Sequence, residues 1–212
     1  MANDIFTIGH STQPIDHFIR LLQSHRINAL ADVRSSPFSR HSPQFSRDAL
    51  RASLKAAGIK YVFLGKELGA RSEDDHCYVG SKVSYALLAK TGLFQQGIQR
   101  IFDGASSFRI ALMCAERDPL DCHRTILVSR ELVARGSPVS HILFDGRIET
   151  HSDAISRLVQ RLHLCETDMF RSYADTINEA YAIQGDAIVY DRNGQHATSH
   201  HDEGTHSSKD GP

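Results

Sequence analysis

One short segment of the sequence combines two thiols with carboxylates, an imidazole and guanidinium groups. It reads Cys114-Ala-Glu116-Arg-Asp-Pro-Leu-Asp-Cys122-His123-Arg124 and follows an apolar run. A helix beginning near Cys122 would offer free backbone N–H groups, which together with arginine bind anions and lower the pKa of a nearby thiol. We therefore expect Cys114 or Glu116 to act as nucleophile or base, His123 to transfer protons and Arg124 to hold an anion.

Two other interpretations of this segment stay open. Free cysteine is often a buried core residue, so Cys114 taken alone could be purely structural. Alternatively, Cys114, Cys122, His123 and His10 could bind a metal ion or support thiol redox chemistry. The spacing between the two cysteines is longer than in structural zinc knuckles, so the spacing itself does not favour a metal.

A second segment, Asp32-Val-Arg34-Ser-Ser36-Pro-Phe-Ser-Arg40, follows another apolar run. Asp32 could act as a general base, accept a hydrogen bond from a ribose hydroxyl, or simply pair with Arg34. Arg34 and Arg40 are candidates for holding phosphate or carboxylate, because a guanidinium group matches these anions in a bidentate geometry. The stretch 32–71 carries eight Lys and Arg against three Asp and Glu, so it could also bind nucleic acid.

A third segment, Gly9-His10-Ser11, places an imidazole and a hydroxyl directly after a short apolar run. His10 could transfer protons, and Ser11 could orient a substrate or cap the helix that follows. Ser36 is a second hydroxyl of this kind, and Arg71 is a further cation in a predicted loop. These residues complete the set of candidate substrate-binding groups.

The elements that position these segments follow from the apolar patterning. Short apolar runs predict strands at 6–8, 29–34, 61–64, 109–114 and 138–144, with helical patterns between them and a helix at 122–135. Apolar strands alternating with helices predict an α/β fold with a mainly parallel sheet and helices on both faces. Ligands bind such sheets beyond the carboxyl ends of the strands, where all three segments lie.

The rest of the chain defines its organisation and surroundings. Residues 1–190 form a single predicted α/β domain that includes C-terminal helical patterns at 151–162 and 177–190, the latter interrupted by Gly185. Residues 191–212 are polar, contain four histidines and are predicted to be a disordered tail. The net charge is −1, the four cysteines are scattered, and no run approaches the roughly 18 apolar residues of a membrane helix. We expect a cytoplasmic protein with reduced thiols and no membrane partner.

Several motifs occur in an order that resembles the bacterial domain of unknown function 488 family. They are Thr7-Ile8-Gly9-His10-Ser11, Asp32-Val33-Arg34-x-x-Pro37-x-Ser39, Gly58-Ile59-x-Tyr61-x-x-Leu64-Gly65 and Cys114-x-Glu116 followed by His123-Arg124. The ending Ile188-Val189-Tyr190 is similar to the C-terminal part of longer members. The resemblance implies a compact α/β domain and a site at the motif positions, but it implies no particular reaction.

The leading hypothesis is an enzyme acting on a small anionic or phosphate-bearing substrate, such as a nucleotide or a nucleic-acid end. It requires no cofactor. A carboxylate nucleophile at Glu116 would suit glycosyl chemistry, whereas a thiolate at Cys114 would suit acyl, phosphoryl or redox chemistry. The alternatives are the metal or thiol-redox module and a nucleic-acid binding module that uses residues 32–71.

Overall fold

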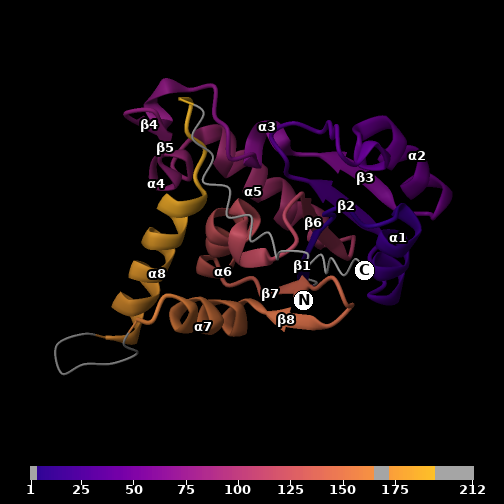
Figure 1. The fold of residues 1–212 in the computed structure, drawn as a ribbon. Coiled ribbons are helices and arrows are strands. Elements are labelled where there is room, and N and C mark those ends of the chain that lie inside the picture. Colours follow the sequence, from indigo (N-terminus) through magenta and orange to yellow (C-terminus); the bar gives the residue numbers. More distant parts are fainter. Residues whose placement is uncertain (1–3, 165–171, 194–212) are drawn as a thin grey trace, which may run out of the picture.

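The computed structural model describes residues 4–164 and 172–193, which alternate strands and helices around one sheet (Figure 1). The strands are β1 Ile5–Gly9, β2 Ala29–Asp32, β3 Lys60–Phe63, β4 Tyr78–Val79, β5 Lys82–Val83, β6 Ile110–Cys114, β7 Val139–Ile142 and β8 Ile148–Thr150. The α-helices are α1 Ile15–Ser24, α2 Arg47–Ala56, α3 Gly65–Leu68, α4 Tyr85–Leu88, α5 Gly92–Ala105, α6 Arg130–Ala134, α7 His151–Arg161 and α8 Tyr173–Ile188.

The central sheet has the strand order β3-β2-β6-β1-β7-β8, and every neighbouring pair is parallel except β7 with β8. The predicted α/β fold with a mainly parallel sheet is therefore confirmed. In the register of the sheet, Gly9 lies opposite Cys114 and Asp32 lies opposite Met113. The carboxyl ends of β1, β6 and β2 are consequently level, which brings the three candidate segments to one edge.

Each face of the sheet is covered by its own helices. Alternate side chains of a strand point to opposite faces, so Met113 joins the core under α1 and α2, while Leu112 joins the core under α5. A third cluster of buried residues joins α7 and α8. Because both faces are covered, the central strands are mostly apolar, and their apolar runs are what the sequence reveals.

The structure differs from the predicted elements in a few places. The predicted helix at 122–135 is instead a π-helical stretch, Arg124–Ser129, followed by α6. Such stretches occur often at functional sites. The edge strand β8 and the hairpin β4–β5 were not predicted, because elements of three and two residues are too short to show a period. The C-terminal helix α8 runs through Gly185 without a break.

A chain of buried hydrogen bonds ties the C-terminal helices to the sheet. Thr7 Oγ1 lies 2.8 Å from His141 Nδ1, His141 Nε2 lies 3.2 Å from His151 Nδ1, and His151 Nε2 lies 2.7 Å from the Tyr181 hydroxyl. These contacts connect β1, β7, α7 and α8 in that order. The packing of α8 against the domain is therefore polar as well as apolar.

The chain beyond α8 returns to the β4–β5 hairpin. The backbone of Asp191 forms an isolated antiparallel β-bridge with that of Lys82. The Arg192 guanidinium lies 3.5 Å from the Tyr78 ring centroid. Residues 194–212, which hold most of the predicted disordered tail, lie outside the described residues. In the described part of the chain, no helix has the length and apolar character needed to cross a membrane.

Candidate functional site

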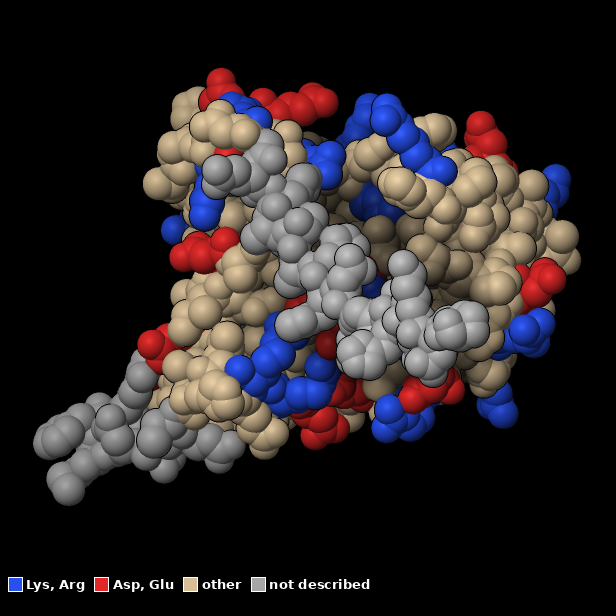
Figure 2. Space-filling model, in the orientation of Figure 1, with Lys and Arg blue, Asp and Glu red and all other residues tan. Residues whose placement is uncertain are grey.

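A cleft of about 560 Å³ opens at the carboxyl edge of the sheet. In Figure 2, blue Lys and Arg side chains surround a hollow in the upper half of the visible face. The cleft is lined by most of the predicted site residues, namely His10, Arg34, Ser36, Arg40, Cys114, Glu116 and His123. Asp32, Ser11, Arg124 and Cys122 do not line it. The expectation that ligands would meet these segments at one edge of the sheet is thus supported by a real cavity.

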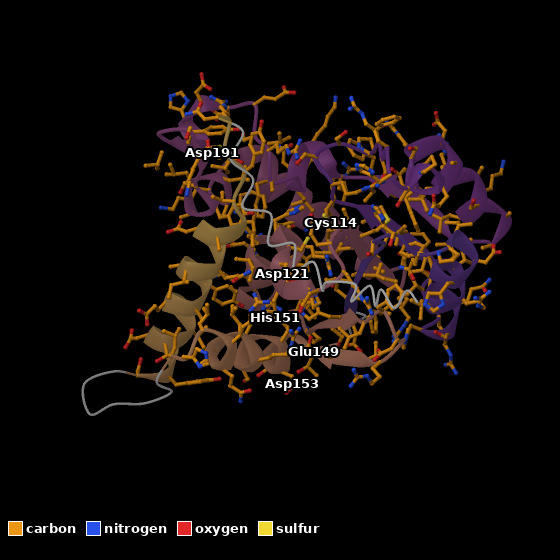
Figure 3. All side chains as sticks on the ribbon, in the orientation of Figure 1. Cys114, Asp121, Glu149, His151, Asp153 and Asp191 are labelled. Carbon is orange, nitrogen blue, oxygen red and sulfur yellow. The ribbon has the colours of Figure 1, made fainter. Side chains whose placement is uncertain are left out.

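Cys114, Cys122 and His123 form a buried cluster at the floor of the cleft. His123 Nδ1 lies 3.7 Å from the Cys114 sulfur and 3.8 Å from the Cys122 sulfur. The other ring nitrogen, Nε2, lies 3.1 Å from the carbonyl oxygen of Val33, which orients the ring. Figure 3 places Cys114 near the centre of the molecule, with the ribbon of the sheet around it.

The two thiols of this cluster differ in their acidity. Burial opposes ionisation of Cys122, but the hydrogen bond from Cys114 and the charges of Arg124 and His123 lower its pKa well below the ordinary value. The hydrogen bond to Cys122 and burial raise the pKa of Cys114 well above the ordinary value. The backbone N–H of Arg124 also donates to the Cys122 sulfur at 3.4 Å. Cys122 is therefore the more acidic thiol of the pair, and Cys114 is the less acidic one.

Glu116 offers its carboxylate to the cleft just beyond the end of β6. Its side chain keeps 42% of its surface exposed, although protein surrounds it on several sides. This partial enclosure raises the pKa of Glu116, and the nearby Cys122 thiolate raises it further, while His123 and Arg124 oppose the change. A carboxyl group with a raised pKa can both take and give a proton closer to neutral pH.

Arg124 was expected to hold an anion, but its side chain lies beneath the cleft and is only 1% exposed. Its Nη1 donates to the carbonyl oxygen of Glu116 at 2.8 Å, and its Nη2 donates to that of Arg117 at 3.3 Å. The same loop passes so close to Gly9 that a Cβ there would lie 1.9 Å from the Glu116 carbonyl oxygen. Arg124 and Gly9 therefore hold the 116–117 loop in place rather than contact a ligand.

Asp32 and Arg34 form a buried ion pair directly below the cleft. Arg34 Nε donates to Asp32 Oδ1 at 2.9 Å and Nη2 donates to Oδ2 at 2.7 Å, while the Tyr61 hydroxyl donates to Oδ2 at 2.8 Å. Arg34 Nη2 also donates to the carbonyl oxygen of Phe45. Of the three roles considered for Asp32, the geometry matches the one as partner of Arg34, and it leaves Arg34 little capacity to bind a substrate anion.

His10 borders the cleft with both ring nitrogens engaged. An arginine can only donate, so His10 Nε2 accepts from Arg34 Nη1 at 3.1 Å, and Nδ1–H donates to the Ser11 carbonyl oxygen at 2.7 Å. Burial lowers the pKa of His10 to about 4. The hydrogen bond to the Ser11 carbonyl oxygen raises this pKa, and the positive charge of Arg34 lowers it. The His10 ring also stacks on the Phe45 ring, with their centroids 4.3 Å apart. With both nitrogens engaged, His10 is better suited to hold Arg34 and the Ser11 backbone in place than to the proton transfer expected of it.

Two cations do face the cleft, and both come from loops. Arg40 is exposed and forms no ion pair with any residue in the described ranges. The Arg71 guanidinium lies 4.7 Å from the Tyr190 ring centroid, and its backbone N–H donates to Ser35 Oγ. Ser36 lies beside them in the cleft wall. These two arginines have the access to solvent that Arg34 and Arg124 lack.

The cleft also has an aromatic part that is absent from the residues predicted from the sequence. Tyr85, Tyr190 and the 66% exposed Phe38 line it together with Ile188. Tyr85 and Tyr190 are far apart in the chain and come together because α8 leads the C-terminal segment back across the β4–β5 hairpin. The only available signal was the C-terminal motif Ile188-Val189-Tyr190 noted for its family resemblance.

The comparison with protein families agrees with the motifs. A family model described as "Domain of unknown function DUF488" matches residues 14–130. The chain belongs to the DUF488 family. Searches of curated proteins and of solved structures return no match.

The DUF488 match covers Asp32, Arg34, Cys114, Glu116 and the Cys122-His123-Arg124 segment, and ends at Arg130, the first residue of α6. The helices α7 and α8 and the cleft residues Ile188 and Tyr190 lie outside it. The cleft residue His10 also precedes the match, so the cleft is assembled from the DUF488 region and from segments on both sides of it.

Proposed function

We propose that this DUF488 protein is an enzyme acting on a small, phosphate-bearing substrate, with a nucleotide as the favoured class. One observation carries the proposal: a single cleft contains a solvent-accessible carboxylate, Glu116, with a raised pKa, and two arginines, Arg40 and Arg71, without carboxylate partners among the described residues. Clusters of perturbed titratable groups in clefts are characteristic of active sites.

The binding roles in this proposal follow from access to the cleft. Arg40 and Arg71 hold the phosphate through charge-assisted hydrogen bonds, and Ser36 contributes a hydroxyl. Tyr85 and Tyr190 provide flat apolar surfaces against which a planar base can stack. The anion-binding role expected of Arg34 and Arg124 is thereby transferred to Arg40 and Arg71.

The proton-transfer role goes to Glu116 for electrostatic reasons. The raised pKa of Glu116 suits a group that accepts a proton from a nucleophile or donates one to a leaving group. Cys114 is a weaker candidate, because its raised pKa keeps it protonated and a thiol is a poor nucleophile. Gly9 and Arg124 support Glu116 by fixing its loop.

The first test measures binding of inorganic phosphate and adenosine monophosphate by isothermal titration calorimetry. Arg71→Ala is expected to weaken binding of both by about tenfold or more, since a charge-assisted hydrogen bond contributes roughly 1.5–3 kcal/mol. Arg51→Ala, a substitution of an exposed arginine on α2, is the matched control and should leave binding unchanged. Equal affinities in the wild type and Arg71→Ala would contradict the assigned phosphate site.

The second test follows turnover of a panel of nucleoside monophosphates by chromatography. Glu116→Gln should lower turnover by roughly 100-fold or more, the usual contribution of a general acid or base. Glu116→Asp, which keeps a carboxylate, should retain part of the activity. Undiminished turnover in Glu116→Gln would rule out the role proposed for this residue.

A further inference from the structure

The geometry of the Cys114, Cys122 and His123 cluster points to a site for a thiophilic divalent cation of the Zn²⁺ class. The three potential ligand atoms all lie within 4.8 Å of one another, and all three residues are buried. This inference deepens the proposed function, and it rests on that function only where it relates the metal to the substrate cleft.

The distances within the cluster match those of a tetrahedral metal site. Zinc binds sulfur at about 2.3 Å and imidazole nitrogen at about 2.0 Å, so the tetrahedral angle places nitrogen roughly 3.6 Å from each sulfur. His123 Nδ1 lies 3.7 Å and 3.8 Å from the two sulfurs. A cation between the three atoms would therefore need only a small adjustment of the side chains.

The surroundings of these atoms also resemble the outer shell of a metal site. A ligating histidine usually donates its second N–H to a carbonyl or carboxylate, and His123 Nε2 lies 3.1 Å from the Val33 carbonyl oxygen. Because a carbonyl oxygen only accepts, Nε2 carries a hydrogen, and a neutral ring therefore turns the lone pair of Nδ1 toward the two sulfurs. The backbone N–H of Arg124 donates to the Cys122 sulfur at 3.4 Å, a contact of the kind that outer-shell groups make with metal-bound ligands.

Three protein ligands leave one tetrahedral position for a molecule from the cleft. Cys114 and His123 line the cleft, whereas Cys122 lies behind them. Catalytic zinc sites have this composition, three protein ligands with an open position, whereas structural sites have four. Glu116 and Asp121 are the carboxylates that line the same cleft.

His10, the fourth ligand considered from the sequence, does not belong to this set. Its Nε2 accepts from Arg34 and its Nδ1–H donates to the Ser11 carbonyl oxygen, so neither nitrogen is available. The thiolate donors favour Zn²⁺, Co²⁺ or Fe²⁺ and disfavour Mg²⁺ and Ca²⁺, which prefer oxygen. Within the described ranges, this is also the one cluster whose ligand atoms have metal-site spacing.

The test titrates reduced, untagged, full-length apoprotein with Co²⁺ and follows the absorption spectrum. Thiolate coordination should give a near-ultraviolet charge-transfer band, and tetrahedral geometry should give intense visible bands. Both should saturate at one ion per chain and disappear on addition of Zn²⁺. Cys122→Ser should weaken binding by more than the roughly 10–100-fold that outer-shell changes cost, and remove part of the charge-transfer band.

Two controls separate this site from other metal-binding groups of the chain. Cys77→Ser removes a thiol that is 1% exposed and is not one of the three grouped ligand residues, and it should leave the cobalt spectrum unchanged. His200→Ala with His201→Ala removes two histidines of the C-terminal tail and should also leave both bands intact. Circular dichroism checks that each variant is folded.

The outcomes separate this inference from the proposed function. Reduced wild-type protein that gives no thiolate–cobalt band, or gives the same band as Cys122→Ser, would overturn the metal site. The phosphate titrations with Arg71→Ala would stand regardless of that result. Conversely, stoichiometric Co²⁺ binding with no effect of Arg71→Ala on phosphate would retain the metal site and reject the proposed function.

Discussion

Asp32 shows how a residue that is attractive for catalysis can serve the fold instead. Its two oxygens accept from Arg34 and from the Tyr61 hydroxyl, and the side chains of Asp32 and Arg34 are 0% and 5% exposed. Asp32 thereby orients the guanidinium group of Arg34, which in turn donates to His10. The network therefore builds part of the wall of the cleft, with Asp32 behind the lining residues His10 and Arg34.

At the residue scale, Asp32→Ala is expected to lower the free energy of unfolding by about 3–5 kcal/mol, because it leaves a buried guanidinium group without its anion. Tyr61→Phe removes one hydrogen bond to the same carboxylate and should cost about 1 kcal/mol. Urea denaturation followed by fluorescence or circular dichroism measures both. A smaller loss in Asp32→Ala than in Tyr61→Phe would refute the importance of the ion pair.

At the scale of elements, the attachment of α7 and α8 to the sheet depends on neutral histidines. Burial lowers the pKa of His151 to about 4, and burial together with His151 lowers that of His141. A histidine with a depressed pKa in the folded state stabilises the protein above its unfolded pKa of about 6.5, and this contribution is lost as the pH falls toward 4. Acidification should thus loosen the contact between α8 and the domain.

The corresponding prediction concerns the pH dependence of unfolding. The free energy of unfolding should decrease between pH 6.5 and about 4, with roughly 3 kcal/mol of the change attributable to His151. His151→Gln should make this decrease shallower. His76→Gln, at a side chain that is 96% exposed, is the control and should leave the slope unchanged. An unaltered slope in His151→Gln would show that this histidine is not held neutral.

At the scale of the whole molecule, the C-terminal segment completes a cleft whose lining residues come mostly from the DUF488 region. Tyr190 reaches the cleft because the backbone after α8 pairs with the β4–β5 hairpin, where the Val83 N–H donates to the Tyr190 carbonyl oxygen. The near-neutral balance of residues 1–190, with 22 basic and 21 acidic side chains, favours a small ligand over a long nucleic acid.

This arrangement predicts that the phosphate and the planar base of a nucleotide are recognised by different residues, the arginines and the tyrosines of the cleft respectively. Tyr190→Ala should weaken adenosine monophosphate binding by about tenfold, because stacking of a base on an aromatic ring is worth roughly 1–3 kcal/mol. Inorganic phosphate should lose less affinity, since it loses only the support that the Tyr190 ring gives to the Arg71 guanidinium 4.7 Å away. Tyr173→Ala, at an exposed tyrosine of α8 outside the cleft, is the matched control. Calorimetry with both ligands provides the measurement, and equal losses for both would argue against stacking on Tyr190.

The sequence by itself determined the fold class and the edge of the sheet at which the site lies. Buried parallel strands must be apolar throughout and end at the same edge, so the runs before His10, Asp32 and Cys114 identified both. The proximity of Cys114 to the Cys122-His123 pair followed from the same reasoning. The two- and three-residue strands are too short to show a hydrophobic period, and the π-helical stretch at 124–129 does not follow the usual helical one. The sequence pattern therefore does not predict these elements.

Only the tertiary structure decided which of these polar groups are free to act. The sequence does not distinguish Arg34 and Arg124 from Arg40 and Arg71 as candidates for binding an anion. In the structure, however, Arg34 is paired with a buried carboxylate, and Arg124 donates to the carbonyl oxygens of a folded loop. Likewise, both nitrogens of His10 are occupied, and Tyr190 enters the cleft from the far end of the chain. Hydrogen-bond saturation and burial depend on residues distant in sequence, which only the packed fold brings together.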